Sequence, residues 1–246
     1  MRRFYTDPQF ISELSAEIYE DAPHIAKVLR MKPDDKILLF DGTGYEYEAV
    51  LTSVDKDICR ANIISKKYSE QEPSIKVYVF QGLPKSDKME IIIQKCAELG
   101  VYEIIPVNMD RCVIKLDNKK QSDKVKRWNK VSTEAAKQCG RGILPKVKPV
   151  ISFKDAICNL KELDCAIMPY EELGHMGVSN LKSVFKNTDA KNIGIIIGPE
   201  GGFSPEEASY AESSGITMIG LGPRILRTET VAPTLLSIIM YENEEF

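Results

Sequence analysis

The chain has 246 residues, of which 43% are hydrophobic and 28% charged, and its formal net charge at pH 7 is −3. This composition is typical of a globular protein, and the length suffices for one or two domains with a buried core. No run approaches the ~18 consecutive apolar residues of a membrane span, and the start of the chain lacks the apolar segment of a secretion signal. We therefore expect a cytoplasmic protein without membrane contact.

Cysteine and histidine are sparse and scattered. Six cysteines form no C-x-x-C pair, and the two histidines, His24 and His175, are far apart in the sequence. This pattern disfavours a metal site and a Ser-His-Asp triad, and reduced thiols are the expected state. We expect no bound metal.

The first 70 residues predict a small β-barrel. Short β-rich runs cover Lys36 to Phe40, Tyr45 to Val50 and Cys59 to Ser65, with Asp41-Gly42 as a turn. Only His24 to Arg30 resembles a helix. The polar stretch from Lys66 to Pro73 is the expected linker, which gives domains at 1–70 and 74–246.

Beyond the linker, apolar runs typical of strands alternate with helical patterns. The expected strands are Lys76 to Gln81, Val101 to Val107, Cys165 to Pro169, Ile193 to Ile197 and Ile216 to Leu221. Ser86 is the expected cap of a helix that buries Met89, Ile92, Ile93, Cys96 and Leu99 and ends at Gly100, and a second helix runs from Ser122 to Cys139 around Trp128. The alternation predicts an α/β domain with a mostly parallel sheet.

The negative total charge conceals a basic segment. Twelve lysines and arginines and only three acids lie between Arg111 and Lys148, a local net charge of +9. Such a segment fits a nucleic-acid phosphate backbone, and Lys85 and Lys88 extend it. The alternative is an ordinary solvated helix face.

Two Gly-Pro loops each follow a predicted strand. The first runs from Ile197 to Glu207 and the second from Leu221 to Thr230. Ligands of α/β sheets bind at the carboxyl ends of strands, so these loops are the candidate site. In the first loop Ser204, Pro205 and Glu207 form the start of a helix with an S-x-x-E capping box. The alternative is a capped turn without a ligand.

The first loop does not match a phosphate-binding loop. It contains neither G-x-x-x-x-G-K-[ST] nor G-x-G-x-x-G, and Glu200 would place a negative charge among the backbone amides. A neutral or cationic ligand with hydroxyl groups suits this loop better.

The paired loops, GPEGGFSPEE and LGPRILRTET, resemble the C-terminal signature of the SPOUT-class methyltransferases that methylate N3 of a uridine in 16S ribosomal RNA. The segments that start at Gln81, Gln94 and Glu134 are similar to the central blocks of that family, and Met1 to Phe4 with His24 to Arg30 is similar to its N-terminal domain. The resemblance covers nearly the whole chain.

The resemblance implies a fold and partners that periodicity does not reveal. It implies a C-terminal domain with a deep trefoil knot, an N-terminal PUA-like RNA-binding barrel, S-adenosylmethionine as cofactor, and a homodimer. The implied reaction is methylation of uridine 1498, in the usual numbering, of 16S rRNA within the 30S subunit.

The same resemblance assigns expected roles to residues. The expected cofactor wall consists of Gly198, Pro199, Glu200, Gly201, Gly202, Leu221, Gly222, Ile225 and Leu226. Arg227 is the expected electrostatic stabiliser and Glu229 the proton acceptor or orienter, although the two could instead form a structural ion pair. The expected RNA contacts are Arg2, Arg3, Arg30, Lys85, Lys88, Arg111, Gln138 and Arg141. Glu98 and Glu134 could orient the uridine or form surface helix pairs.

Uracil N3 is an imide nitrogen that carries a proton at neutral pH, so its methylation requires alignment, loss of that proton and stabilisation of charge on O2 or O4. Two other functions stay open at this point. One is 2′-O-ribose methylation by another SPOUT enzyme, and the other is a non-catalytic RNA-binding protein of ribosome assembly.

Overall fold

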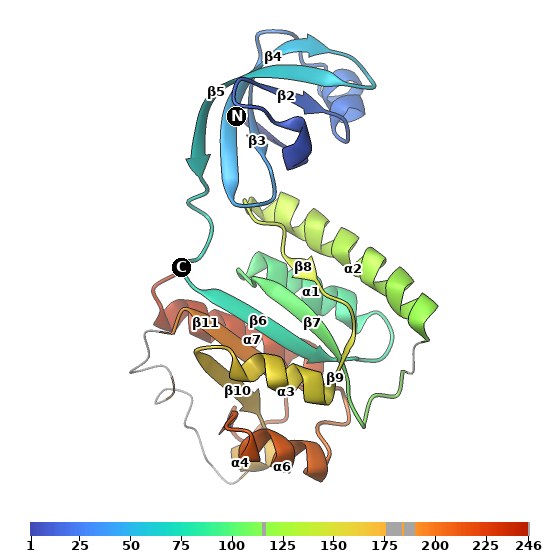
Figure 1. Ribbon diagram of the computed structural model, residues 1–246, viewed down its shortest axis with the longest axis vertical. Helices are drawn as coiled ribbons and strands as arrows, with labels where there is room; N and C mark the ends of the chain where they lie inside the picture. The colour runs from blue at the N-terminus through green and yellow to red at the C-terminus, as the bar shows by residue number, and fades with distance from the viewer. Residues whose placement is uncertain (115–116, 176–183, 185–189, 246) are drawn as a thin grey trace. The chain divides into compact units, whose positions relative to one another are not determined.

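A computed structural model describes residues 1–114, 117–175, 184 and 190–245 (Figure 1). The chain forms two compact units. The first contains Met1–Glu72 and Ala136–Leu144, and the second contains Pro73–Ala135 and Pro145–Phe246. Within the described residues, no helix combines the length and the hydropathy needed to cross a membrane.

The first unit is built on a curled sheet of five strands in the order β1-β3-β4-β5-β2. The strands are β1 (Arg2–Tyr5), β2 (Ser15–Ile18), β3 (Lys36–Phe40), β4 (Tyr45–Val54) and β5 (Cys59–Tyr68). β1 pairs with β3 in parallel, and the other pairs are antiparallel. Two short helical turns, η1 (Pro8–Phe10) and η2 (His24–Val28), complete the unit. The expected linker starts too early, because Lys66 to Tyr68 pair with β4 as part of β5.

A buried ion pair attaches the segment Ala136–Leu144 to this unit. The Arg141 guanidinium donates to the Glu72 carboxylate at 2.7 Å, and the two side chains are only 5% and 1% exposed. Arg3 donates to the Arg141 carbonyl at 2.6 Å and pairs with Glu46 at 3.1 Å. Each buried charge therefore has an opposite charge beside it, which offsets its loss of hydration.

The second unit contains a seven-stranded sheet in which the strand pairs among the described residues are all parallel. Its order is β12-β10-β11-β6-β7-β8, with β9 also paired to β7. The strands are β6 (Lys76–Gly82), β7 (Glu103–Asn108), β8 (Lys146–Val147), β9 (Ile151–Ser152), β10 (Cys165–Pro169), β11 (Asn192–Ile197) and β12 (Thr217–Ile219). The central strands are continuous apolar runs because helices cover both faces of a parallel sheet.

Helices α1 and α7 pack against each other on one face of this sheet, and α3 packs on the other (Figure 1). The described helices are α1 (Lys88–Glu98), α2 (Asn118–Cys139), α3 (Phe153–Lys161), α4 (Glu171–His175), α6 (Pro205–Ser213) and α7 (Thr228–Glu242). Trp128 of α2 is buried, as are Met89, Ile92, Ile93 and Cys96 of α1, in agreement with the predicted apolar faces.

The predicted cap of α1 was wrong. Ser86 adopts a left-handed backbone with φ of 56°, and Asp87 takes the N-cap position without a side-chain hydrogen bond. The other end agrees with the prediction, since Gly100 follows the helix with φ of 87°.

Four neighbouring parallel strands end at the same edge of the sheet. Ile197 of β11 lies opposite Gln81 of β6, and Pro169 of β10 lies opposite Ile219 of β12. The segments that follow β6, β10, β11 and β12 are therefore brought together, as expected at the carboxyl edge of an α/β sheet.

Candidate functional site

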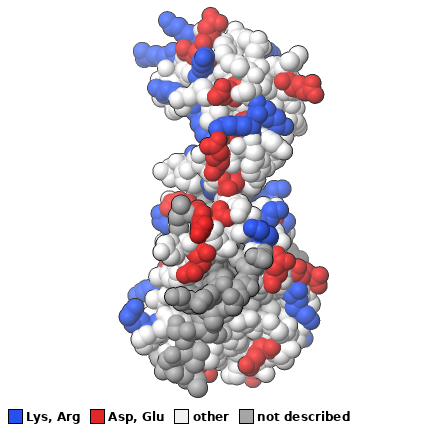
Figure 2. Space-filling model, turned by 90° about the vertical axis from the view of Figure 1, so that its left-hand side faces the viewer, with Lys and Arg blue, Asp and Glu red and all other residues white. Residues whose placement is uncertain are grey.

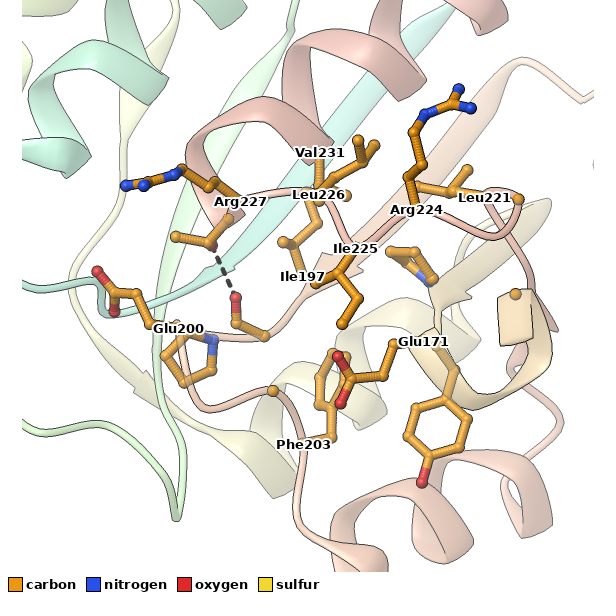
Figure 3. Close-up of a pocket in the computed structure, with 18 of the residues that line it drawn as sticks. Glu171, Ile197, Glu200, Phe203, Leu221, Arg224, Ile225, Leu226, Arg227 and Val231 are labelled. Carbon is orange, nitrogen blue, oxygen red and sulfur yellow. Dashed lines mark hydrogen bonds between the residues drawn. The ribbon is translucent and has the colours of Figure 1, made fainter. Parts of the chain in front are cut away.

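A pocket of about 320 Å³ lies at this carboxyl edge, within the size range of small-molecule sites. Its walls come from the two Gly-Pro loops, the segment after β10 and the starts of α1 and α7 (Figure 3). The lining residues are Lys88, Pro169, Tyr170, Glu171, Gly174, Ile197, Gly198, Pro199, Glu200, Gly202, Phe203, Leu221, Gly222, Arg224, Ile225, Leu226, Arg227, Thr228 and Val231.

The first loop is held by its own capping box. The Glu207 amide donates to the Ser204 hydroxyl at 3.2 Å, and the Ser204 amide donates to the Glu207 carboxylate at 2.9 Å. Ser204 also donates to Asp110, whose amide donates to Glu207 at 2.9 Å. The predicted capping box is thus confirmed, and it also fastens the loop to the segment after β7.

Two glycines give the first loop its shape. Gly202 has φ of 67°, a conformation that glycine adopts without a steric penalty. A Cβ on Gly201 would lie 3.1 Å from the Cβ of Arg111, whose guanidinium donates to the Gly201 carbonyl at 2.9 Å. Gly201 does not line the pocket, so its close contact is with the protein itself.

A buried hydrogen-bond chain connects the first loop to the start of α7. The Thr228 hydroxyl donates to the Gly198 carbonyl at 2.8 Å, a bond marked in Figure 3, and accepts from the Gln81 amide at 3.0 Å. Gln81 also donates to the Gly82 carbonyl. The end of β6, the first loop and residue 228 are therefore fixed to one another, which positions the neighbouring Arg227.

Lys88 connects two carboxylates at the edge of the pocket. Its ammonium group lies 3.2 Å from Glu200 of the first loop and 3.1 Å from Glu229 of α7. Hydrogen bonds to Glu229 and Glu200 raise the pKa of Lys88 above its usual value despite some desolvation. Desolvation would raise the pKa of Glu229, but its own amide, Lys88 and Arg227 together lower it.

Glu200 is held ionised in a similar way. Its desolvation is outweighed by hydrogen bonds from its own amide, from the Lys85 amide and from Lys88, so the pKa of Glu200 is lowered. Both carboxylates therefore carry their charge at neutral pH, and Lys88 balances one of the two. Arg227 is exposed beside them, and Figure 3 shows its side chain on the same side of the pocket as Glu200.

The third wall of the pocket comes from the segment after β10. In Figure 3 the side chains of Glu171, Ile225 and Phe203 point toward one another, whereas Arg224 points away from them. Burial, followed by Glu172 and Glu171, raises the pKa of the Tyr170 phenol. A Cβ on Gly174 would lie 2.4 Å from the Gly222 carbonyl, so α4 packs directly against the second loop.

The structure brings most of the expected cofactor wall together. Gly198, Pro199, Glu200, Gly202, Leu221, Gly222, Ile225 and Leu226 line the same pocket, with Arg227 at its edge, whereas Gly201 does not line it. Glu229 does not line the pocket but pairs with Lys88, which does, and the described residues contain no Arg227–Glu229 ion pair, although the charge of Arg227 helps to lower the pKa of Glu229. Sequence reasoning missed Tyr170, Glu171 and Phe203, although the first two follow a correctly predicted strand.

The expected RNA contacts fall into two groups. Arg2, Arg30, Lys85, Arg111 and Gln138 are exposed. In contrast, Arg141 is buried against Glu72, and Arg3 stacks over Phe40 at 3.7 Å beside Glu46. Lys88 is held by its two carboxylates. Arg3, Lys88 and Arg141 therefore have carboxylate partners within the protein, and RNA contact by the eight residues stays a prediction.

Glu98 and Glu134 show no link to the pocket. Glu98 pairs with Lys95 on the surface of α1 at 2.9 Å, which is the helix pairing considered from the sequence, and Glu134 is exposed on α2. Among the described residues, no group of three or more His, Cys, Asp or Glu side chains is placed to hold a metal ion.

Comparisons with known proteins identify the family of this chain. The RNA methyltransferase domain family matches residues 70–240, and the RNA methyltransferase PUA domain family matches residues 20–64. The chain belongs to these RNA methyltransferases, and more particularly to the family of ribosomal RNA small subunit methyltransferase E. It is 38% identical to the protein of that name from Bacillus subtilis, with 96% of this chain and 97% of that protein covered.

Solved structures agree with this assignment. A structure from Legionella pneumophila, described as a methyltransferase in complex with SAM, is 30% identical with a TM-score of 0.83 and covers 97% of this chain and 96% of its own. The ribosomal RNA small subunit methyltransferase E of Neisseria gonorrhoeae bound to S-adenosyl methionine is 27% identical with a TM-score of 0.82, covering 98% of this chain and 97% of its own.

Proposed function

We propose that this protein transfers a methyl group from S-adenosylmethionine to N3 of uridine 1498 of 16S rRNA, in the cytoplasm, with the assembled 30S subunit as substrate. The observation that carries the proposal is the meeting of both Gly-Pro loops at one pocket, in a chain that belongs to the small subunit methyltransferase family. We further propose a homodimer, a trefoil knot in residues 74–246 and an RNA-binding role for residues 1–70.

The pocket suits S-adenosylmethionine in size and chemistry. Apolar side chains of Ile197, Leu221, Ile225 and Leu226 offer a surface for a flat base, and the loop backbone offers amides and carbonyls. The carboxylates of Glu171 and Glu200 fit a ligand with positively charged groups. When bound, this cofactor supplies an electrophilic methyl group on a sulfonium.

The protein's own residues would then prepare the uracil. N3 lies on the Watson–Crick edge, so the base must be unpaired to reach the pocket. We propose that the Arg227 guanidinium stabilises the negative charge that develops on O2 or O4 as the N3 proton leaves. Glu229, held ionised by Lys88, is the proposed proton acceptor or the group that orients Arg227.

The test is transfer of labelled methyl groups to purified 30S subunits, followed by digestion of the RNA to nucleosides and mass analysis. We expect one product whose methyl group stays with the uracil when the glycosidic bond is broken. A methyl group that stays with the ribose would instead support 2′-O methylation. Absence of transfer despite binding of S-adenosylmethionine or RNA would favour the non-catalytic alternative.

A further inference from the structure

Helix α2 carries a row of lysines that the pocket does not use. Lys119, Lys126 and Lys130 are all exposed, and none of them forms an ion pair with another described residue. At 3.6 residues per turn, the spacing of seven and four residues places the three side chains within about 40° of one another around the helix. Trp128, on the opposite side, is buried.

The row is extended and its charge is not neutralised. It covers twelve residues, and its two ends lie about 16 Å apart along the helix axis. Two acids of α2 lie near the row, Asp123 three residues before Lys126 and Glu134 four residues after Lys130, so these five side chains carry three positive charges against two negative. Two neighbouring basic residues of α2 differ from the row because each has an ion-pair partner. Lys120 pairs with Asp117, and Arg127 pairs with Glu90.

The face of the molecule drawn in Figure 2 shows no such row among its described residues. On the face in Figure 2, basic and acidic side chains are interspersed without a continuous area of one sign. In a chain with a net charge of −3, the row places three lysines, without ion-pair partners in the described part of the chain, on one side of a single helix.

We infer that Lys119, Lys126 and Lys130 of α2 form a contact surface for the phosphate backbone of the substrate RNA, separate from the methyl-transfer pocket. This inference rests on the proposed function for the identity of the polyanion. A lysine attracts a phosphate as a point charge, whichever nucleobase that phosphate belongs to. The surface therefore adds affinity for RNA and helps to orient it, but adds no sequence preference.

Charge removal with a matched control tests this surface. The test variant carries Lys119→Gln, Lys126→Gln and Lys130→Gln. The control carries Lys154→Gln, Lys161→Gln and Lys191→Gln, three exposed lysines in other elements of the same unit that also form no ion pair with described residues. Both variants lose the same formal charge, so a difference between them reports position rather than total charge.

The measurement is the dependence of affinity on salt concentration, with purified 30S subunits as the probe. Each phosphate contact contributes about 0.7 to 0.9 to the slope of log K against log salt. We expect the slope of the test variant to fall by about 2 to 3 and that of the control to stay near wild type. Equal slopes for the two variants would overturn the inference.

Two further readouts separate this inference from the proposed function. Affinity for S-adenosylmethionine, measured by calorimetry, should be unchanged in both variants, which also shows that the pocket is folded. If wild-type protein binds no 30S subunits, the proposed substrate is wrong and the inference falls with it. If wild type binds and methylates while the slopes are equal, only the inference is wrong.

Discussion

Lys88 and Glu229 form an ion pair of 3.1 Å that joins the first turn of α1 to the first turn of α7. Glu229 is two residues from Arg227, the side chain that we expect to stabilise charge on the uracil. The same lysine holds Glu200 of the cofactor loop at 3.2 Å. A single ammonium group thus connects the proposed binding and catalytic parts of the site.

Replacing Lys88 by Met should shift the pH dependence of methyl transfer. The substitution removes a group that lowers the pKa of Glu229, so the acidic limb of the rate profile should move to higher pH. Single-turnover rates between pH 5 and 9 measure this. Lys95→Met is the matched control, because Lys95 lies on the same helix and pairs only with Glu98 at the surface. A profile that coincides with wild type would show that Glu229 does not titrate in the reaction.

The same ion pairs should make stability pH-dependent. The pKa of Glu200 and that of Glu229 are lowered in the folded protein, so their contribution is present above the ordinary glutamate pKa of about 4.3 and is lost as the pH falls through the lowered values. The difference in melting temperature between wild type and Lys88→Met should be full at pH 7 and should shrink below about pH 4. A difference independent of pH would assign the effect to packing of the lysine stem.

Arg227→Ala and Glu229→Gln should separate chemistry from structure. Removing the guanidinium should lower the transfer rate roughly tenfold to a thousandfold with a smaller change in cofactor affinity, as for an interaction strongest in the transition state. Glu229→Gln should recover part of its activity at higher pH, where the imide ionises without a proton acceptor. Rates that fall only in proportion to melting temperature would remove both residues from the catalytic set.

Gly222→Ala should weaken cofactor binding more than it weakens the fold. Gly222 has φ of 88°, and a Cβ added there would meet no atom of another segment within 4 Å; Gly215, after α6, has the same φ and the same open space. Both alanine variants incur a similar backbone cost, of order 1–2 kcal/mol. Only Gly222 lines the pocket, so calorimetry should show a loss of S-adenosylmethionine affinity for Gly222→Ala alone. Equal affinities in the two variants would contradict the assignment of the second loop.

Thr228→Val should loosen the connection between the first loop and α7. The buried hydroxyl is lost, and the Gly198 carbonyl is left without its donor, at a cost of about 1–3 kcal/mol. Thr234→Val on the same helix removes only a bond to the Thr230 carbonyl within one turn and should change stability by less than about 0.5 kcal/mol. Urea unfolding measures both, and similar losses would mean that the buried chain contributes no more than a surface bond.

Local sequence signals predicted the elements of this fold well where a residue acts on its neighbours. The strand Cys165–Pro169 was predicted with both ends correct, and both hydrogen bonds of the predicted Ser204 capping box are present. The prediction that Ser86 caps α1 was wrong. A serine before a helix indicates a cap only if its own backbone is extended, whereas the backbone of Ser86 is left-handed. The meeting of the two loops followed from the general rule for parallel sheets.

Contacts between distant segments could not be predicted in this way. In the sequence, Arg141 is one of twelve basic residues in a basic segment. Its partner Glu72 is 69 residues away and almost fully buried, so the pair could not be predicted from neighbouring residues. Lys88 likewise depends on two carboxylates from other elements. Glu171 follows a predicted strand end, and the rule that selected the two Gly-Pro loops would have selected it if applied to every strand.

The contact between Gly174 and Gly222 sets the spacing between two walls of the pocket, because both residues line it. Because a Cβ at position 174 would collide with the Gly222 carbonyl, alanine there would act as a wedge that pushes the second loop away from α4. The natural pocket thus depends on glycine at position 174, where α4 and the second loop approach too closely to leave room for a Cβ. Position 174 is consequently a place to engineer acceptance of cofactor analogues with groups larger than methyl, without altering any side chain of the catalytic set.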